Sequence, residues 1–249
     1  MIVYGLHAVA EALRVGRVRR IRIAGRDDDR LRALLNDARA RGVRVEVVTR
    51  DSLEREARHG VHQGVVADVE DLPEATLADL TRADRGAPLI VVLDGVEDPH
   101  NVGAIIRTID AAGATGVVRQ TRRAAPLDGA AAKSSAGAVH HVPVADVVNI
   151  ARALEELKEA GVWTVGLDAG GQTPYYELDL TVPTALVMGA EASGLRRLVR
   201  ERCDFVASIP MAGHVGSLNV SAAAAVVLFD AVRQRRSQGA ASRNSRRRS

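Results

Sequence analysis

The stretch Ile209-Pro-Met-Ala-Gly-His-Val-Gly-Ser-Leu-Asn-Val-Ser221 leads directly into the apolar run from Ala222 to Phe229. Glycine and alanine leave the backbone of its first half almost unshielded, so a ligand can approach the main-chain N–H groups. Ser217, Asn219 and Ser221 then supply side chains that favour the start of a helix. The stretch predicts either a ligand-binding loop that opens a helix or simply a capped C-terminal helix.

The composition indicates a globular protein with a core of small aliphatic side chains. Of the 249 residues, 47% are hydrophobic and only 2% are aromatic. This length suits one large domain or two modest ones, and the scarcity of aromatic rings argues against extensive base stacking. The single cysteine, Cys203, excludes an intrachain disulfide, and neither an export signal nor a membrane-length apolar run is found. We therefore expect a cytoplasmic protein without a membrane partner.

Basic residues are unevenly distributed along the chain. The formal net charge is +3, and the seven arginines that follow Asp230 have no acidic neighbour, which leaves residues 1–230 at −4 (+3 less +7). Five arginines fall within residues 14–22 and are candidates for RNA phosphate contacts, although solvated surfaces often carry such runs. The Arg-rich segment 239–249 cannot bury a core and is predicted to be a disordered tail.

The N-terminal part of the chain predicts a small α/β domain over residues 1–70. The pattern predicts helices at 4–14, at 29–41 and from about 52, and strands at 20–24, 43–48 and 61–67. Residues 71–88 contain proline and glycine, lack a strong strand pattern, and are predicted to link two domains.

From residue 89 to 238, short apolar strands alternate with helices. Strands are expected at 89–93, 116–118, 139–143, 162–167, 185–188 and 205–209, and helices at 102–112, 146–160, 194–202 and at the end. Such strands without polar alternation indicate an α/β fold whose parallel sheet is covered on both faces. Ligands bind beyond the carboxyl ends of parallel strands, so the candidate loops are 94–101, 168–173, 189–194 and 211–217.

Motifs of several other enzyme classes are absent from the sequence. No GxGxxG follows a strand, Gly129-Ala-Ala-Ala-Lys-Ser134 lacks the second glycine of a phosphate loop, and neither GxSxG nor HExxH occurs. His59 and His62 lie three residues apart, and His140 and His141 are expected on opposite faces of a strand. Because no convergent acidic residues accompany these histidines, we expect no metal site.

Three polar segments each follow a predicted parallel strand. The first, Leu93 to Arg107, contains Asn101 as a candidate helix cap. The second, Val187 to Leu195, holds Glu191 in a turn bracketed by glycines. The third is the opening stretch.

These segments resemble the three motifs of the TrmH family of SPOUT-class RNA ribose 2′-O-methyltransferases. The resemblance covers nearly the entire chain and is greatest to the members that methylate a guanosine of 23S ribosomal RNA. It rests on Tyr4-Gly-Leu-His-Ala-Val9, Val61-His-Gln-Gly-Val65, Leu93-Asp-Gly-Val-Glu-Asp-Pro-His-Asn101, Ser208-Ile-Pro-Met-Ala-Gly213 and Ser217-Leu-Asn-Val-Ser221. The region 133–141 matches only loosely.

The resemblance implies a fold that spacing alone does not give. Its parallel sheet ends in a deep C-terminal trefoil knot, which general chain-topology rules disfavour. It also implies a homodimer, S-adenosylmethionine as methyl donor, and an N-terminal RNA-binding domain similar to a ribosomal-protein fold.

The same resemblance assigns roles to individual residues. Gly189, Ile209 and Leu218 would bind S-adenosylmethionine, largely through backbone groups. Arg107 would be the essential arginine. Since the pKa of arginine exceeds about 12, we interpret it as a donor to the ribose 2′-oxygen or the adjacent phosphate, not as a base. The alternative is an ordinary ion pair on a helix surface.

Four further polar residues complete the candidate catalytic set. Glu191 would organise the site, Ser217 would hydrogen-bond the ribose or the cofactor, Asn219 would cap and position the loop, and Asn101 would hold the first motif. Two alternatives to a 23S rRNA enzyme remain open. One is a transfer-RNA ribose methyltransferase, and the other is an RNA-binding module that keeps the fold without turnover.

Overall fold

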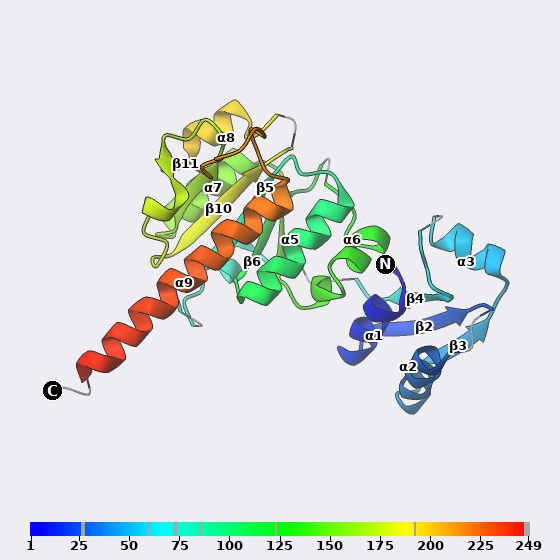
Figure 1. The fold of residues 1–249 in the computed structure, drawn as a ribbon. Coiled ribbons are helices and arrows are strands. Elements are labelled where there is room, and N and C mark those ends of the chain that lie inside the picture. Colours follow the sequence, from blue (N-terminus) through cyan, green and yellow to red (C-terminus); the bar gives the residue numbers. More distant parts are fainter. Residues whose placement is uncertain are drawn as a thin grey trace. The chain divides into compact units, whose positions relative to one another are not determined.

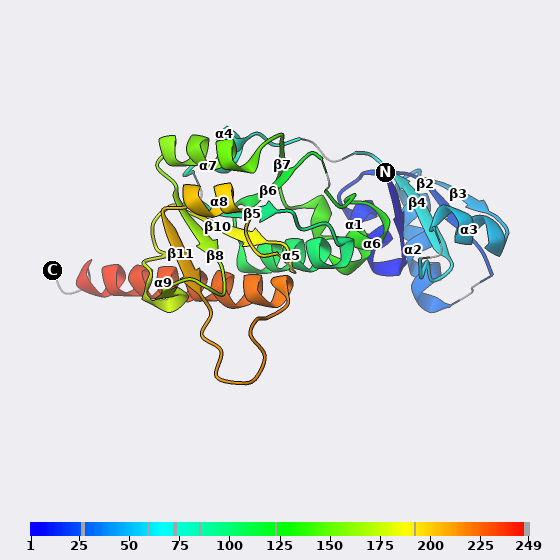
Figure 2. The ribbon, with the colours of Figure 1, turned by 90° about the horizontal axis from the view of Figure 1, so that it is seen from above.

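The backbone forms two compact units, each built from separate stretches of the chain. The computed structural model in Figures 1 and 2 describes residues 1–25, 28–58, 60–71, 74–84, 86–122, 124–191 and 193–246, the side chains of 240–246 excepted. Contacts group residues 1–73, 98–107 and 125–141 into a first unit, and residues 74–97, 108–124 and 142–249 into a second.

The first unit contains a four-stranded sheet in the order β1-β4-β2-β3. Strand β4 is antiparallel to both β1 and β2, whereas β2 and β3 are parallel. Helix α1 packs its apolar residues inward, and the carboxylate of Asp28 caps α2 by accepting from the Leu31 N–H. The elements are β1 (Ile2–Tyr4), α1 (Leu6–Arg14), β2 (Val18–Ile23), α2 (Asp29–Ala40), β3 (Arg44–Val47), α3 (Arg50–Glu56) and β4 (Val65–Val69).

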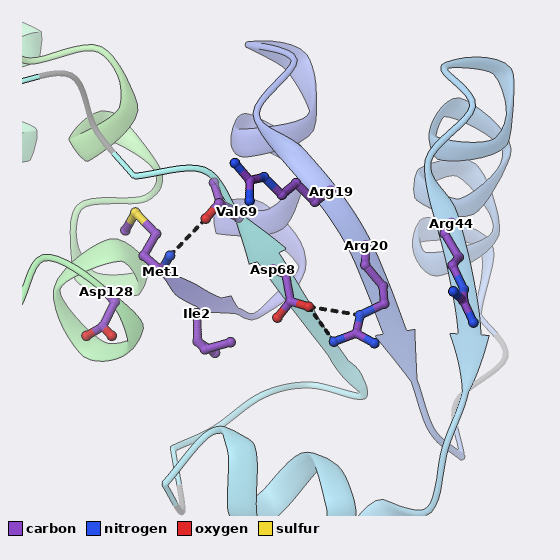
Figure 3. A pocket seen from close by; sticks show the side chains of 8 residues that line it. All are labelled: Met1, Ile2, Arg19, Arg20, Arg44, Asp68, Val69 and Asp128. Atoms are coloured by element: carbon purple, nitrogen blue, oxygen red, sulfur yellow. Dashed lines mark hydrogen bonds and ion pairs between the residues drawn. The ribbon is translucent and has the colours of Figure 1, made fainter.

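The arginine run on β2 is balanced by carboxylates that the sheet brings beside it. Arg20 pairs with Asp68 at 2.7 Å and with Glu46 at 3.5 Å. The nearly buried Arg22 pairs with Glu56 at 2.6 Å and also with Asp68. Figure 3 shows Arg20 and Asp68 facing each other across neighbouring strands. These two arginines therefore link strands of the sheet and are poor candidates for phosphate contacts.

Residues 125–141 also belong to the first unit and form α6 (Gly129–Ser134) and the 3-10 turn η1 (Ala138–His140). The predicted strand 139–143 is wrong. Positive φ angles at Ala136 (51°) and Gly137 (88°) turn the chain into η1, and the next strand begins only at Val144. His140 consequently lies in the interior of the unit, not on the face of a sheet.

Burial of His140 predicts a loss of stability in mild acid. Burial and the neighbouring Arg17 and His141 lower the pKa of His140 from 6.5 to about 4, and Glu11 opposes this only weakly. Between these values the unfolded chain binds more protons, so stability is complete above pH 6.5 and falls as the pH approaches 4. Going from pH 7 to pH 5 should cost about 2 kcal/mol of unfolding free energy. Urea titrations should show a clearly smaller loss for His140→Leu, and an equal loss would contradict this origin.

The second unit contains a seven-stranded sheet in the order β7-β6-β5-β10-β8-β11-β9. All of its strand pairs are parallel, as the sequence predicts. Figure 2 shows α7 and α8 on one face of the sheet and α9 on the other. The strands are β5 (Leu89–Asp94), β6 (Gly116–Gln120), β7 (Val144–Val147), β8 (Trp163–Leu167), β9 (Thr173–Pro174), β10 (Thr184–Gly189) and β11 (Phe205–Ser208). The remaining helices of this unit are α4 (Leu77–Leu80), α7 (Ile150–Glu159), η2 (Tyr175–Glu177), α8 (Arg197–Arg202) and α9 (Val220–Arg246). Helix α5 (Pro99–Ala112) is shared, because its residues 99–107 belong to the first unit and the rest to the second.

Helix α5 begins earlier than predicted, and Asn101 is not its cap. The carboxylate of Asp98 accepts from the N–H groups of His100 (3.1 Å) and Asn101 (3.3 Å). Pro99 occupies the first helical position, where a missing N–H costs nothing. Asn101 therefore lies within the first turn, and its side chain is buried.

Helix α9 is anchored to the amino ends of β5 and β10. The half-buried guanidinium of Arg235 donates to the carbonyl oxygens of Leu180 (2.9 Å), Val182 (2.8 Å) and Pro88 (3.0 Å). The helix continues to Arg246, into the segment for which the sequence predicts a disordered tail. Residues 239–246 extend a helix that is already formed, and adding residues to an existing helix requires no new nucleation, which is the physical reason for the difference. No helix within the described ranges is long and apolar enough to cross a membrane.

Candidate functional site

A cavity of about 400 Å³ lies at the carboxyl ends of β8, β10 and β11, within the second unit. The chain after β8 contributes residues 167–169, and the chain around the end of β10 contributes 188–191, 193 and 194. The remaining walls come from 209, 211 and 216–218, and from 220 and 223 on α9. Five of the predicted site residues line this cavity, namely Gly189, Glu191, Ile209, Ser217 and Leu218.

The turn after β10 folds tightly back on itself. Ala190 and Gly194 exchange two backbone hydrogen bonds of 3.1 and 2.8 Å. A Cβ atom on Gly189 would lie 2.2 Å from the carbonyl carbon of Gly194. Gly189 is thus required by the packing of the turn, which holds the main chain at the edge of the cavity.

An ion pair between a half-exposed arginine and a buried carboxylate holds this turn to the end of β5. Asp94, the register partner of Gly189, has a fully buried side chain. Its carboxylate accepts from the Arg196 backbone N–H at 2.8 Å and from Arg196 Nε at 2.6 Å. Arg196 also donates to the Gln120 side chain at 2.9 Å. Sequence reasoning missed this pair, although Asp94 lies inside the first polar segment and Arg196 follows directly after the second.

Asn219 joins the second and third polar segments. Its Oδ1 accepts from the N–H groups of Ser221 (2.9 Å) and Ala222 (3.4 Å), which caps α9 as predicted. Its Nδ2 donates to Glu191 Oε1 at 2.5 Å. Asn219 therefore fixes both the start of the helix and the side chain of Glu191.

The loop between β11 and α9 is largely open to solvent. Figure 2 shows it extending away from the sheet. A Cβ atom placed on Gly213 or Gly216 would meet no other atom within 4 Å, and Leu218 is 38% exposed. The main chain here is as accessible as the sequence predicts, so the loop can contact a ligand or another molecule through its backbone.

Asp168 lines the cavity, and sequence reasoning did not select it. Its Oδ1 accepts from the Gly170 N–H at 2.8 Å, and its Oδ2 lies 3.9 Å from Arg200 Nε. The signal was available, because the loop 168–173 was already a candidate and Asp168 is its first polar residue. Its carboxylate gives the cavity an acceptor for hydroxyl or ammonium groups.

Arg107 and Asn101 lie on α5 in the part that belongs to the first unit. The Arg107 side chain is exposed. The Arg107 guanidinium forms no ion pair with a described residue. The structure therefore gives no support to the alternative reading of Arg107 as one member of an ion pair on a helix surface. The other predicted catalytic residues, Glu191, Ser217 and Asn219, thus lie together in the second unit. That Arg107 and Asn101 act at the same site stays a prediction.

Comparison with known proteins places this arrangement in a family. Residues 88–229 match the SpoU rRNA Methylase family, and residues 2–75 match the RNA 2′-O ribose methyltransferase substrate binding family. The chain belongs to the SpoU rRNA methylase family. The matched region contains every element that lines the cavity, together with the Asp94–Arg196 pair.

Relatives within the SpoU family are similar along almost their whole length. The 23S rRNA (guanosine-2′-O-)-methyltransferase RlmB of Pseudomonas aeruginosa is 47% identical over 94% of this chain and 96% of its own. That of Vibrio parahaemolyticus is 44% identical over 94% and 96%. Among solved structures, the SpoU methyltransferase AviRb of Streptomyces viridochromogenes in complex with AdoMet has a TM-score of 0.79 at 32% identity, covering 95% of this chain and 91% of that one.

Proposed function

We propose that this protein transfers the methyl group of S-adenosylmethionine to the ribose 2′-hydroxyl of a guanosine in 23S rRNA. The observation that carries the proposal is the cavity that gathers Gly189, Ile209, Leu218, Ser217 and Glu191 at the carboxyl ends of parallel strands. Relatives that are 44–47% identical over 94% of the chain bear the name of this activity.

The cavity has the chemistry that S-adenosylmethionine requires. Its volume of about 400 Å³ lies in the range typical of cofactor sites. Ile209 and Leu218 provide apolar walls for the adenine, while the turn at Gly189 and the loop at Gly216 offer main-chain groups. Asp168 adds a carboxylate for hydroxyl or ammonium groups. When bound, the cofactor supplies a methyl group on a positively charged sulfonium.

The polar residues of the chain then have distinct tasks. Methyl transfer is an in-line displacement, so catalysis depends on aligning the 2′-oxygen and stabilising the negative charge that develops on it. Arg107 donates hydrogen bonds to that oxygen or to the adjacent phosphate. Ser217 hydrogen-bonds the ribose, and the bond from Asn219 keeps Glu191 oriented toward the substrate. Asn101 holds the first turn of α5.

The proposal extends to assembly and organisation. The protein acts as a cytoplasmic homodimer, with residues 1–70 binding RNA, 71–88 as a linker and 89–238 as the methyltransferase domain. Its C-terminal segment is threaded as a trefoil knot, and residues 1–70 adopt a fold similar to that of a ribosomal protein. These statements rest on the resemblance of the motifs and on the two family matches.

The decisive experiment maps ribose methylation in cellular RNA. Cells that lack the gene should lose one 2′-O-methyl guanosine in 23S rRNA, and the wild-type gene should restore it. Loss of a mark in transfer RNA instead would overturn the choice of substrate. Failure of the purified protein to bind S-adenosylmethionine in calorimetry would favour the non-catalytic RNA-binding alternative.

A further inference from the structure

A second cleft, far from the cofactor cavity in sequence, surrounds the loop from Gly60 to Gly64. It encloses about 800 Å³ within the first unit and is lined by residues 24, 25, 50, 54 and 60–64. The loop contains most of the Val61-His-Gln-Gly-Val65 motif that the sequence analysis singled out and that the catalytic mechanism does not use. We infer that this cleft binds an unpaired nucleobase of the substrate RNA, an inference that rests on the proposed function.

The loop is held in place before any ligand arrives. The Gln63 side chain accepts from the Leu6 backbone N–H at 3.1 Å, at the start of α1. Lys133 Nζ donates to the Val61 carbonyl at 2.9 Å. A Cβ atom on Gly60 would lie 2.3 Å from the Tyr4 hydroxyl, so only glycine fits there. Such preorganisation lowers the entropic cost of binding.

The loop lines the cleft with two polar residues, His62 and Gln63, and one aliphatic residue, Val61. His62 Nδ1 accepts from the Gly64 N–H at 3.1 Å, so in the neutral imidazole the proton lies on Nε2, which is a donor. Gln63, which also lines the cleft, has a φ angle of 53°, a conformation rarely adopted by residues other than glycine. Val61 is 67% exposed, although it is aliphatic.

Two residues of α3 that also line the cleft carry opposite charges. Arg50 pairs with Glu54 at 3.3 Å, and the Arg50 side chain remains 78% exposed. The charges of the described residues that line the cleft therefore offset each other, which suits a base better than a phosphate. A guanidinium plane can stack on a base, and an exposed aliphatic side chain can cover its edge. RNA is read in sequence mainly through such unstacked bases.

The cleft in Figure 3 is the competing candidate for RNA contact, and its charges argue against it. It encloses about 610 Å³ and is lined by Arg19, Arg20 and Arg44. Each of these arginines already faces a carboxylate, and Asp68 and Asp128 themselves line the cleft. This arrangement offers little to an RNA phosphate, but it provides a matched control. Arg44 resembles Arg50 in exposure and in its glutamate partner.

The first test measures binding of the full-length protein to a 23S rRNA fragment that the wild-type enzyme methylates. By fluorescence anisotropy, Arg50→Ala should raise Kd about tenfold and Val61→Ala several-fold, whereas Arg44→Ala should change it less than twofold. Arg50→Ala should leave the slope of log Kd against log salt unchanged, because stacking releases no counterion. A slope reduced by about one would identify a phosphate contact and overturn the assignment.

The second test identifies the base. Abasic nucleotides are introduced one at a time at the single-stranded positions of the fragment. One position should raise the wild-type Kd about tenfold and have no additional effect on Arg50→Ala. Purely additive effects at every position would overturn the proposal. Calorimetry with S-adenosylmethionine and thermal unfolding should match the wild type for all three variants, which confirms that they are folded.

The outcomes separate this inference from the proposed function. If the wild-type protein methylates 23S rRNA but Arg50→Ala and Arg44→Ala bind alike, only the nucleobase cleft is wrong. If the wild-type protein methylates no ribosomal RNA, the function itself is wrong.

Discussion

Arg107→Ala is expected to slow methyl transfer by about 10²–10³-fold, the usual effect of removing a donor to a developing oxyanion. Binding of S-adenosylmethionine should be unchanged in calorimetry, because none of the residues that line the cavity belongs to α5. Since Arg107 is exposed and forms no ion pair with a described residue, its loss should also leave the unfolding temperature almost unchanged. The assay is single-turnover methylation of a 23S rRNA fragment with saturating cofactor.

Two further variants show what kind of contact Arg107 makes and whether the effect is specific to it. Arg107→Lys keeps the positive charge but loses the planar fork, so partial recovery would indicate a phosphate contact and no recovery would indicate directed hydrogen bonds. Arg152→Ala removes an exposed arginine paired with Glu156 on α7 and should have no effect on the rate. Near-normal turnover by Arg107→Ala would refute the assignment of Arg107.

The edge of the sheet that carries the cavity could be predicted from the sequence because two rules agreed, whereas the individual cofactor residues came from the family resemblance. Parallel strands bring their carboxyl ends to one edge, and the polar segments of the sequence follow those ends. Gly189, Ile209 and Leu218 accordingly line the same cavity, although they come from segments that are up to 29 residues apart. The helix cap by Asn219 could also be predicted, because a capping side chain and the N–H groups that it binds are neighbours in the sequence.

Features that depend on strand register, or on the choice between competing local signals, could not be predicted from the sequence. Both Asp98 and Asn101 are good helix caps, and only the presence of Pro99 at the first helical position decides between them. The arginines on β2 were candidates for contacts with RNA phosphates, but the register of the sheet places Asp68 beside them. The turn at Gly137 likewise places a 3-10 turn where the sequence predicts the strand Val139-His-His-Val-Pro143.

The pair Asp94–Arg196 is the largest omission, because its members are 102 residues apart and neither is unusual alone. Arg196→Ala is expected to lower the free energy of unfolding by about 3–5 kcal/mol, since it leaves the fully buried Asp94 carboxylate without its counter-charge. It should also weaken S-adenosylmethionine binding, because Arg196 follows directly after the turn that lines the cavity.

The neighbouring residue provides the matched control for that change. Arg197 pairs with Glu201 on the surface of α8, where both side chains are largely exposed, so Arg197→Ala should cost less than about 1 kcal/mol. The double variant Asp94→Asn with Arg196→Met removes both charges and should be more stable than Arg196→Ala alone, because no unpaired ion is buried. Urea unfolding of all four proteins compares these losses of stability. Equal destabilisation by Arg196→Ala and Arg197→Ala would show that the buried carboxylate does not depend on Arg196, and the turn after β10 would then need another anchor.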